Sequence, residues 1–198
     1  MNFDLQGFLA QLGPYDTLML VWSAWVISWL LAAAWSAQTV KRPSLGSEAL
    51  YRIVTVAGFV LLIGFHPREG STLILWRTPE AVRWLLVAAT ALCFAFAWWA
   101  RIHLGKLWSG RVTRKENHRI VDTGPYAIVR HPIYTALLFA ALCLAIFRGD
   151  EIAFAGFAIA TLGFVIKARL EEKFLRSELG PEAYDAYARR VPMLVPGF

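Results

Sequence analysis

The chain has 198 residues, of which 58% are hydrophobic, 14% aromatic and 17% charged, and its formal net charge is +6. A soluble domain is about 45–50% apolar, so this composition excludes an ordinary soluble globular protein and indicates an integral membrane protein. About five spans of roughly 20 residues would occupy half of the chain. The sequence therefore predicts a single membrane domain over residues 1–198, with no room for a separate soluble domain.

The excess of basic residues is more typical of lysines and arginines held on the cytoplasmic side of a membrane than of a nucleic-acid-binding protein. We therefore expect no nucleic-acid partner. Cys93 and Cys143 lie in apolar runs without a CxxC or a histidine-rich partner, so neither a disulfide nor a metal site is predicted. Residues 1–17 contain no lysine or arginine, so the basic start of a cleaved signal peptide is missing and we expect the first span to be retained.

Three apolar segments in the first hundred residues each predict a transmembrane helix. Residues 18–37 contain no charged side chain and have tryptophans near both ends, as a spanning helix should. Residues 49–65 follow, with Arg52 near enough to the start to reach the lipid head groups. The sequence TPE at 78–80, a capping residue followed by a proline and an acid, predicts the start of the third helix, 81–100.

Two shorter apolar segments, 133–147 and 152–166, predict the last two helices. Fifteen residues extend about 22 Å, which is short for a hydrocarbon core near 30 Å, so we expect a tight helical hairpin that turns at residues 148–151. Both ends of the hairpin emerge on one side, so the loop 101–131 and the tail 167–198 should face each other. The predicted fold is an all-α membrane domain of about five transmembrane helices with a short amphipathic C-terminal tail.

The distribution of basic residues predicts the orientation in the membrane. Segments 38–52, 101–131 and 167–198 together contain 16 lysines and arginines, against 4 in the rest of the chain. Because basic residues are retained in the cytoplasm, we expect a multi-pass protein with its N-terminus outside and its C-terminus in the cytoplasm. No internal repeat is apparent, which disfavours a transporter built from inverted repeats.

A polar and aromatic motif, GPYAIVRHPIY at residues 124–134, stands directly before the predicted hairpin. Pro132 has no N–H and disfavours helical geometry in the residue before it, so a helix should begin at Pro132 with His131 at its cap. The unpaired N–H groups of a helix N-terminus suit a carboxylate or phosphate. Arg130, His131 and Tyr134 would surround that opening.

A pair of acidic residues, Glu171 and Glu172, follows the last apolar segment at the membrane edge, where ionisable groups are costly unless paired or solvated. Lys167 lies one helical turn before Glu171, and by themselves these two residues would form an ordinary surface ion pair worth a few tenths of a kcal/mol. Considered singly, His131 is more often a structural cap, and the tyrosines of the motif are more often interfacial aromatics. Only the joint occurrence of these groups indicates a function.

Taken together, the GPY turn, the RHPxY box, the Glu171–Glu172 pair and the tail GPEAYDAYARRVP resemble the isoprenylcysteine carboxyl methyltransferase family and the related membrane phospholipid methyltransferases. The resemblance covers roughly residues 101–196, and residues 1–100 match only as generic apolar helices. It implies an enzyme that uses S-adenosylmethionine. The residues implied to enclose this cofactor are His118, Arg119, Ile120, Val121, Tyr126, His131, Pro132, Ile133, Tyr134 and Glu171.

The resemblance also suggests how the acceptor is held. The arginine that meets the substrate carboxylate in the eukaryotic prenylcysteine enzymes aligns with Lys167, and we expect Lys167 and Arg130 to be the catalytic residues. A sulfonium methyl group is already activated, so the protein needs mainly to hold donor and acceptor in line and to keep water out. A carboxylate acceptor needs no base, whereas an amine must lose a proton, and no metal is needed.

The expected function is therefore methyl transfer from S-adenosylmethionine to a lipidic acceptor, with the carboxylate of an isoprenylcysteine-like substrate as the first choice. The alternative acceptor is a phospholipid amine such as an ethanolamine head group. Two weaker alternatives are an NADPH-dependent membrane reductase and a non-enzymatic lipid-binding protein. We expect the acceptor to enter from the bilayer and the cofactor from the cytoplasm. The expected partners are this substrate and membrane lipids, without an obligate protein partner.

Overall fold

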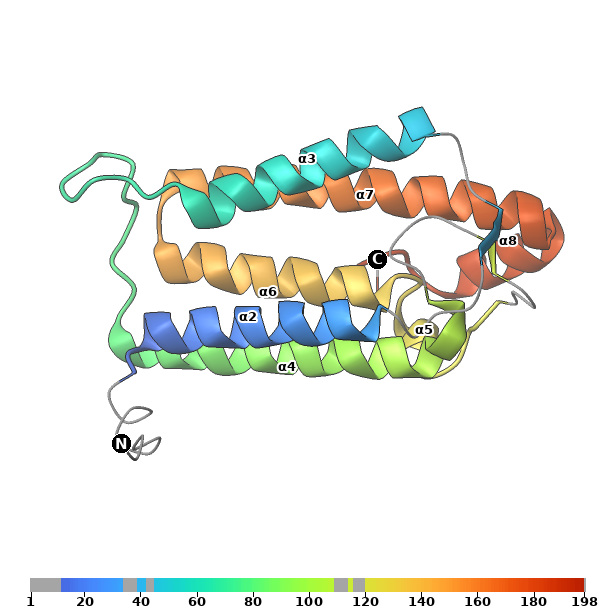
Figure 1. The fold of residues 1–198 in the computed structure, drawn as a ribbon, viewed down its shortest axis with the longest axis horizontal. Helices are drawn as coiled ribbons and strands as arrows, with labels where there is room; N and C mark the ends of the chain where they lie inside the picture. Colours follow the sequence, from blue (N-terminus) through green and yellow to red (C-terminus); the bar gives the residue numbers. More distant parts are fainter. Residues whose placement is uncertain (1–11, 34–38, 42–44, 109–113, 116–119, 198) are drawn as a thin grey trace.

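A computed structural model describes residues 12–33, 39–41, 45–108, 114–115 and 120–197. Across these ranges the chain is almost entirely helical (Figure 1). The long helices are α2 (Pro14–Ala32), α3 (Leu45–Gly64), α4 (Glu80–Leu104), α6 (Pro132–Arg148) and α7 (Glu151–Leu179). The short elements are the 3₁₀ turn η1 (Gly105–Leu107), α5 (Pro125–Ile128) and α8 (Pro181–Arg190). The all-α prediction holds except for a two-stranded antiparallel ribbon of β1 (Thr39–Lys41) and β2 (Arg114–Lys115).

The long helices lie roughly parallel to one axis and alternate in direction along the chain (Figure 1). Helix α7 packs most extensively against α3, and α6 packs against α4, which also contacts α2. By length and composition, α2, α4 and α7 can each cross a membrane, while α6 is shorter. Outward-facing apolar side chains such as Leu31 and Leu92, which are 74% and 70% exposed, give the bundle a surface suited to lipid.

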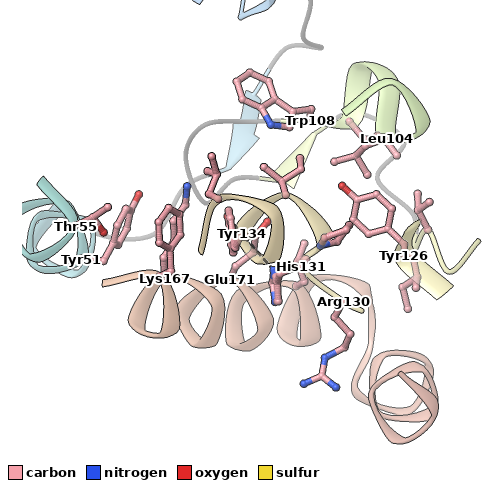
Figure 2. Close-up of a pocket in the computed structure, with 18 of the residues that line it drawn as sticks. Tyr51, Thr55, Leu104, Trp108, Tyr126, Arg130, His131, Tyr134, Lys167 and Glu171 are labelled. Carbon is pink, nitrogen blue, oxygen red and sulfur yellow. Dashed lines mark hydrogen bonds and ion pairs between the residues drawn. The ribbon is translucent and has the colours of Figure 1, made fainter. Parts of the chain in front are cut away.

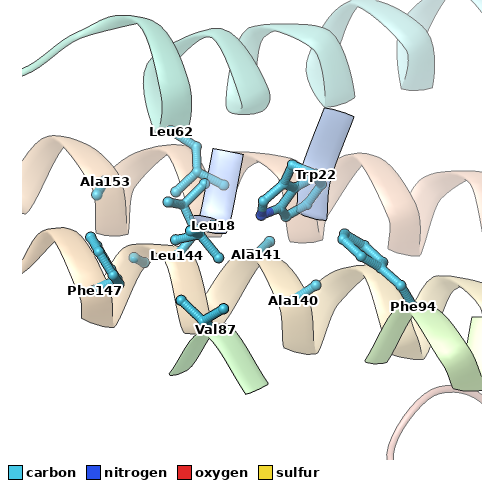
Figure 3. Packing of buried hydrophobic residues seen from close by; sticks show 11 residues of the cluster. Leu18, Trp22, Leu62, Val87, Phe94, Ala140, Ala141, Leu144, Phe147 and Ala153 are labelled. Atoms are coloured by element: carbon cyan, nitrogen blue, oxygen red, sulfur yellow. The ribbon is translucent and has the colours of Figure 1, made fainter. Parts of the chain in front are cut away.

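The largest apolar core lies between α2, α4 and α6 (Figure 3). Trp22 of α2 meets Phe94 of α4 edge to face, with ring centroids 4.8 Å apart, a favourable arrangement for two aromatic rings. The facing positions of α6 are small, Ala140 and Ala141, and both are fully buried. Small side chains on α6 thus leave room for large aromatic side chains from its neighbours.

Helices α3 and α7 approach so closely that several positions between them accept only glycine. A Cβ atom on Gly58 would lie 2.3 Å from the backbone nitrogen of Ala160, and one on Gly163 would lie 2.2 Å from Oγ1 of Thr55. Helices in membranes associate through such small residues because backbone packing replaces the missing hydrophobic drive. This contact fixes the face of α3 that carries Thr55 against the first half of α7.

The predicted hairpin is present, and a network of polar contacts closes its turn. Gly149 has a φ of +66°, a left-handed conformation that suits glycine. Asp150 caps α7 by accepting from the Ala153 N–H at 2.9 Å, and it forms a buried ion pair with Arg148 at 2.9 Å. Arg148 also donates to the carbonyl of Leu62 at 2.6 Å. The turn is thereby tied to the end of α3.

The last predicted apolar segment, 152–166, is only part of a longer helix, because α7 has 29 residues and extends to Leu179. At 1.5 Å per residue this is about 43 Å, longer than a hydrocarbon core. The polar residues after 166 continue the helix because their side chains find partners on the 120–134 segment and on α8. The end of α7 therefore forms one wall of the site.

The segment between α3 and α4 differs from its prediction in one detail. Thr78 does not cap α4: its hydroxyl donates instead to the carbonyl of Ile146 at 2.8 Å, and Pro79 holds the cap position without a side-chain bond. Nearby, the N–H of Leu75 donates to the carbonyl of Gly149 at 2.8 Å. The segment packs over the hairpin turn because these contacts satisfy carbonyls that the end of α6 leaves open.

The first helix also begins and ends earlier than predicted. The apolar run predicted 18–37, but α2 covers Pro14–Ala32, and residues 34–38 lie outside the described ranges. Pro14 occupies the first turn, where a missing N–H costs nothing, and Asp16 accepts from the N–H of Gly13 at 3.3 Å. Proline and an acid thus extend the helix beyond its apolar run.

Candidate functional site

A cavity of about 620 Å³ opens at the end of the bundle where α5 and α8 lie (Figure 2). This volume falls within the roughly 300–1,000 Å³ that is usual for small-molecule sites. Its walls come from α3, the ends of α2 and α4, the segment 120–134, the second half of α7 and α8. Segments far apart in the sequence therefore meet at one site, as the facing of the 101–131 loop and the tail predicts.

Most of the site residues predicted from sequence line this cavity. The ten that do so are Ile120, Val121, Tyr126, Arg130, His131, Pro132, Ile133, Tyr134, Lys167 and Glu171. The other two, His118 and Arg119, lie outside the described residues. The structure brings the ten together, and their assignment to cofactor or acceptor stays a prediction.

The turn before the motif is built around a glycine. Gly124 has a φ of +57°, which favours glycine, and a Cβ atom there would lie 2.8 Å from the His103 ring and push it aside. The His103 ring stacks on Tyr126, with centroids 6.4 Å apart and planes at 22°. Burial, together with the charge of Glu171, raises the pKa of Tyr126 far above its usual value. Its phenol therefore stays protonated in the cavity wall.

Helix α6 begins at Pro132 with His131 in the cap position, as predicted. The backbone before it is held by the chain after α8: the N–H of Arg130 donates to the carbonyl of Pro192 at 2.8 Å, and the N–H of His131 donates to that of Met193 at 3.1 Å. The RHP motif thus has its backbone fixed by the C-terminal segment. The His131 side chain is left to point toward α7.

The two glutamates of α7 both contact this motif, and Figure 2 shows Glu171 beside Tyr134 and His131. Glu172 accepts from Nε of Arg130 at 2.7 Å and lies 3.1 Å from Nε2 of His131. Glu171 accepts from the Tyr134 hydroxyl at 2.6 Å and lies 3.9 Å from Nδ1 of His131. His131 therefore stands between two carboxylates. Both carboxylates that contact His131 come from one turn of α7.

Arg130 connects three parts of the site. Besides its bond to Glu172, its Nη1 donates to the carbonyls of Ala188 and Val191 at 3.0 and 2.5 Å. In Figure 2 its guanidinium extends away from Tyr134, toward α8. These contacts make Arg130 a bracket between the motif, α7 and α8. Its predicted catalytic role stays a prediction.

Lys167 lies at the opposite end of the cavity from Tyr126 (Figure 2). Its ammonium is 4.8 Å from the ring centroid of Tyr134 and 5.6 Å from that of Tyr51, distances at which a cation is attracted to an aromatic face. The rings of Tyr134 and His131 are themselves nearly parallel, 5.2 Å apart. A continuous row of polar aromatic groups thus runs from Lys167 to His131.

Sequence reasoning missed part of the lining. Tyr184 and Tyr187 of α8 are buried and face the cavity, and the Tyr187 hydroxyl donates to the carbonyl of Tyr126 at 2.8 Å. Both belong to the tail motif quoted above, so a signal existed, but no role was assigned to them. Trp108 and Tyr51 also line the cavity. Neither belongs to a motif, and only the folded structure identifies them.

The chemistry of these walls suits an organic ligand with charged groups. Aromatic faces attract cations and stack on flat rings, and a carboxylate and an ammonium stand within the same cavity. Among the residues that the structure describes, no group of three or more histidine, cysteine, aspartate or glutamate side chains could hold a metal ion.

Sequence comparison agrees with the arrangement of the site. The model of the isoprenylcysteine carboxyl methyltransferase family matches residues 82–177, from the first turn of α4 to the last turn of α7. The chain is thus similar to this family over just under half of its length. As expected of an integral membrane protein, the matched region contains two of the three long apolar helices. It excludes α2, α3 and α8, so Tyr51, Tyr184 and Tyr187 reach the cavity from outside it.

Individual relatives carry different names. The chain is 34% identical to the cobalt-zinc-cadmium resistance protein CzcN of Cupriavidus metallidurans over 74% of its length and 62% of that protein. It is 32% identical to protein-S-isoprenylcysteine O-methyltransferase B of Arabidopsis thaliana over 43% of its length and 44% of that protein. It is 29% identical to methanethiol S-methyltransferase 2 of Bradyrhizobium diazoefficiens over 72% of its length and 58% of that protein. The chain thus matches less than two thirds of the length of each relative.

Proposed function

We propose that this protein is a membrane methyltransferase that uses S-adenosylmethionine and acts on an acceptor with an anionic head. The observation that carries the proposal is the cavity in which His131 and Tyr134 meet Glu171 and Glu172 at 2.6–3.9 Å, beside the ammonium of Lys167. The match to the isoprenylcysteine carboxyl methyltransferase family supports methyl transfer as the reaction class.

The cavity residues fit this cofactor, which carries a sulfonium, an adenine ring, an ammonium and a carboxylate. Trp108 and Tyr126 offer aromatic faces for the ring or the sulfonium. Glu171 suits the ammonium, and the start of α6 at Pro132 suits the carboxylate. When bound, the cofactor supplies an activated methyl group. The protein must then orient the acceptor and exclude water.

The described side chains can perform these two tasks. Arg130 and Glu172 hold His131 in place, and the Tyr134 hydroxyl fixes one oxygen of Glu171. The walls between these groups are aromatic and aliphatic, which keeps water from the reacting atoms. Arg130 acts in this scheme as a positioning residue.

The acceptor class follows from Lys167. An ammonium at the cavity wall favours an anionic nucleophile, and it repels a cationic amine head group, which disfavours the phospholipid alternative. Of the relatives, one is named for an isoprenylcysteine acceptor and another for methanethiol. A carboxylate and a thiolate are both anions, so Lys167 suits either. We put the prenylated cysteine carboxylate first and a thiol second.

Cofactor binding tests the proposal before any acceptor is known. We expect His131→Ala and Glu171→Ala each to weaken binding of S-adenosylmethionine by about 1–3 kcal/mol, the usual cost of losing a buried polar contact. Calorimetry on purified protein in detergent measures this, with Glu182→Gln on the exposed face of α8 as the matched control. Unchanged affinity in both folded alanine variants would leave these residues with a structural role and contradict the proposed site.

A further inference from the structure

One buried tyrosine at the cavity has a hydroxyl proton for which the described residues provide no acceptor. Tyr51 of α3 is only 4% exposed, and its buried hydroxyl makes no well-formed hydrogen bond. The guanidinium of the neighbouring Arg52 lies within interaction range of this hydroxyl, but a guanidinium can only donate, so the hydroxyl proton is left without an acceptor. A buried hydroxyl without a partner is unfavourable, and native structures seldom retain one unless a ligand completes it. Thr55, one turn further along α3, also lines the cavity with an unpartnered hydroxyl. This face of α3 is therefore prepared for a polar ligand.

The charges around Tyr51 indicate the sign of that ligand. Two cations approach its ring: Nζ of Lys167 at 5.6 Å and the guanidinium of Arg52 at 5.9 Å from the centroid. Two carboxylates are near, and one oxygen of each is engaged elsewhere, while Oε1 of Glu48 is buried without a partner. Glu48 pairs with Arg52, and Glu171 accepts from the Tyr134 hydroxyl. A hydroxyl donor beside these two cations is better suited to an anion than to an ammonium group.

The position of Tyr51 separates it from the residues assigned to the cofactor. In Figure 2, Tyr51 and Lys167 lie at one side of the cavity, while Tyr126 lies at the other and His131 between them. The close contact of Thr55 with Gly163 holds this side of α3 against α7. Tyr51 thus faces the part of the cavity that the acceptor would enter.

We propose that Tyr51 is a specificity-determining residue whose hydroxyl donates a hydrogen bond to the anionic head of the methyl acceptor, beside the ammonium of Lys167. The inference rests on the proposed function and adds to it a residue from α3, outside the region that the family model matches. The acceptor's oxygen or sulfur anion forms the new bond to the methyl carbon while the carbon–sulfonium bond breaks and its electron pair returns to sulfur. No proton moves, so Tyr51 remains a neutral donor throughout.

This arrangement also distinguishes substrate from product. After transfer, the acceptor head is a neutral ester or thioether, which accepts a hydrogen bond more weakly than an anion does. Lys167 then has no charge to attract. The pair formed by Tyr51 and Lys167 should therefore bind the acid more tightly than its methyl ester or its carboxamide.

The test compares Tyr51→Phe, which removes only the hydroxyl, with Tyr15→Phe at the exposed start of α2, where Tyr15 is 44% exposed. Calorimetry with an S-farnesylated N-acetylcysteine and with its carboxamide should show that wild type and Tyr15→Phe prefer the acid. We expect Tyr51→Phe to bind the acid about tenfold more weakly, with the carboxamide and S-adenosylmethionine unaffected. The melting temperature should change little, because the hydroxyl has no well-formed hydrogen bond to lose and Arg52 keeps its ion pair with Glu48.

Several results would overturn the inference. Acid binding by Tyr51→Phe equal to that of wild type is one, and an equal loss of cofactor affinity, which would assign Tyr51 to the cofactor, is another. Absence of acid binding in wild type would also overturn it. Wild type that binds the acid but does not methylate it would instead refute the proposed function, so the two failures can be told apart.

Discussion

The close contact between α3 and α7 predicts a sharp difference between two glycine-to-alanine substitutions in one helix. In Gly58→Ala the new Cβ would lie 2.3 Å from the nitrogen and 2.7 Å from the Cα of Ala160. These are backbone atoms of a packed helix, so they cannot yield as a flexible side chain would. In Gly64→Ala, at the end of the same helix, the new Cβ meets nothing within 4 Å.

The magnitudes follow from opposing terms. Replacing glycine by alanine in a helix favours folding by up to about 1 kcal/mol, and overpacking a well-filled contact costs about 1–3 kcal/mol or more. We therefore expect Gly58→Ala to lower the free energy of unfolding by about 1–2 kcal/mol and Gly64→Ala to raise it by up to about 1 kcal/mol. For a protein of this size a difference of about 1–3 kcal/mol corresponds to roughly 2–12 °C in melting temperature.

Thermal unfolding in detergent, followed by the fluorescence of the nine tryptophans, measures this difference. Because α3 carries Tyr51 into the cavity, Gly58→Ala should also weaken binding of the acceptor acid, while Gly64→Ala should leave it unchanged. Equal melting temperatures for the two variants would refute the packing of α3 on α7, and with it the placement of Tyr51 beside Lys167.

Three further predictions concern the site and the membrane orientation. Glu172→Gln should lower the free energy of unfolding by about 1–2 kcal/mol, because the carboxylate that accepts from Arg130 is only 18% exposed. The melting temperature of Glu172→Gln should therefore fall while that of Glu182→Gln does not. Lys167→Ala should lower kcat/KM for a prenylated cysteine acid by about 10- to 100-fold without changing cofactor affinity, and equal or faster steady-state turnover would exclude its role with the carboxylate. A reporter fused after Phe198 should be cytoplasmic and one before Asn2 external, and the opposite result at either end would contradict the predicted orientation.

Features that depend on local sequence could be predicted well. The start of α6 at Pro132, with His131 at its cap, follows from the geometry of proline alone. The motif and the Glu171 segment flank a hairpin of two antiparallel helices. Because such a hairpin brings the segments before and after it to the same end of the bundle, their meeting could be predicted. Residue types and spacing thus predicted that these two segments meet, whereas most of the ten cavity residues were named from the family resemblance.

Features that depend on contacts between distant segments could not be predicted. Arg101 was counted with the loop residues, yet it is fully buried at the end of α4, where it donates to the carbonyl of Ala32 at 3.0 Å and stacks on Trp108 at 4.2 Å. The end of α7 was not foreseen either, since its polar residues have partners only in the folded protein. Tyr51 lies in an apolar run without a motif, and only the packing of α3 on α7 indicates its place.

Transfer of a labelled methyl group tests the central claim most directly. Purified protein in lipid nanodiscs is supplied with S-adenosylmethionine labelled on its methyl group and, separately, with an S-farnesylated N-acetylcysteine, methanethiol and phosphatidylethanolamine. We predict label in the prenylated acid or the thiol, and its loss in Glu171→Ala but not in Tyr15→Phe. Label in the amine alone, or in no acceptor although the cofactor binds, would contradict the account.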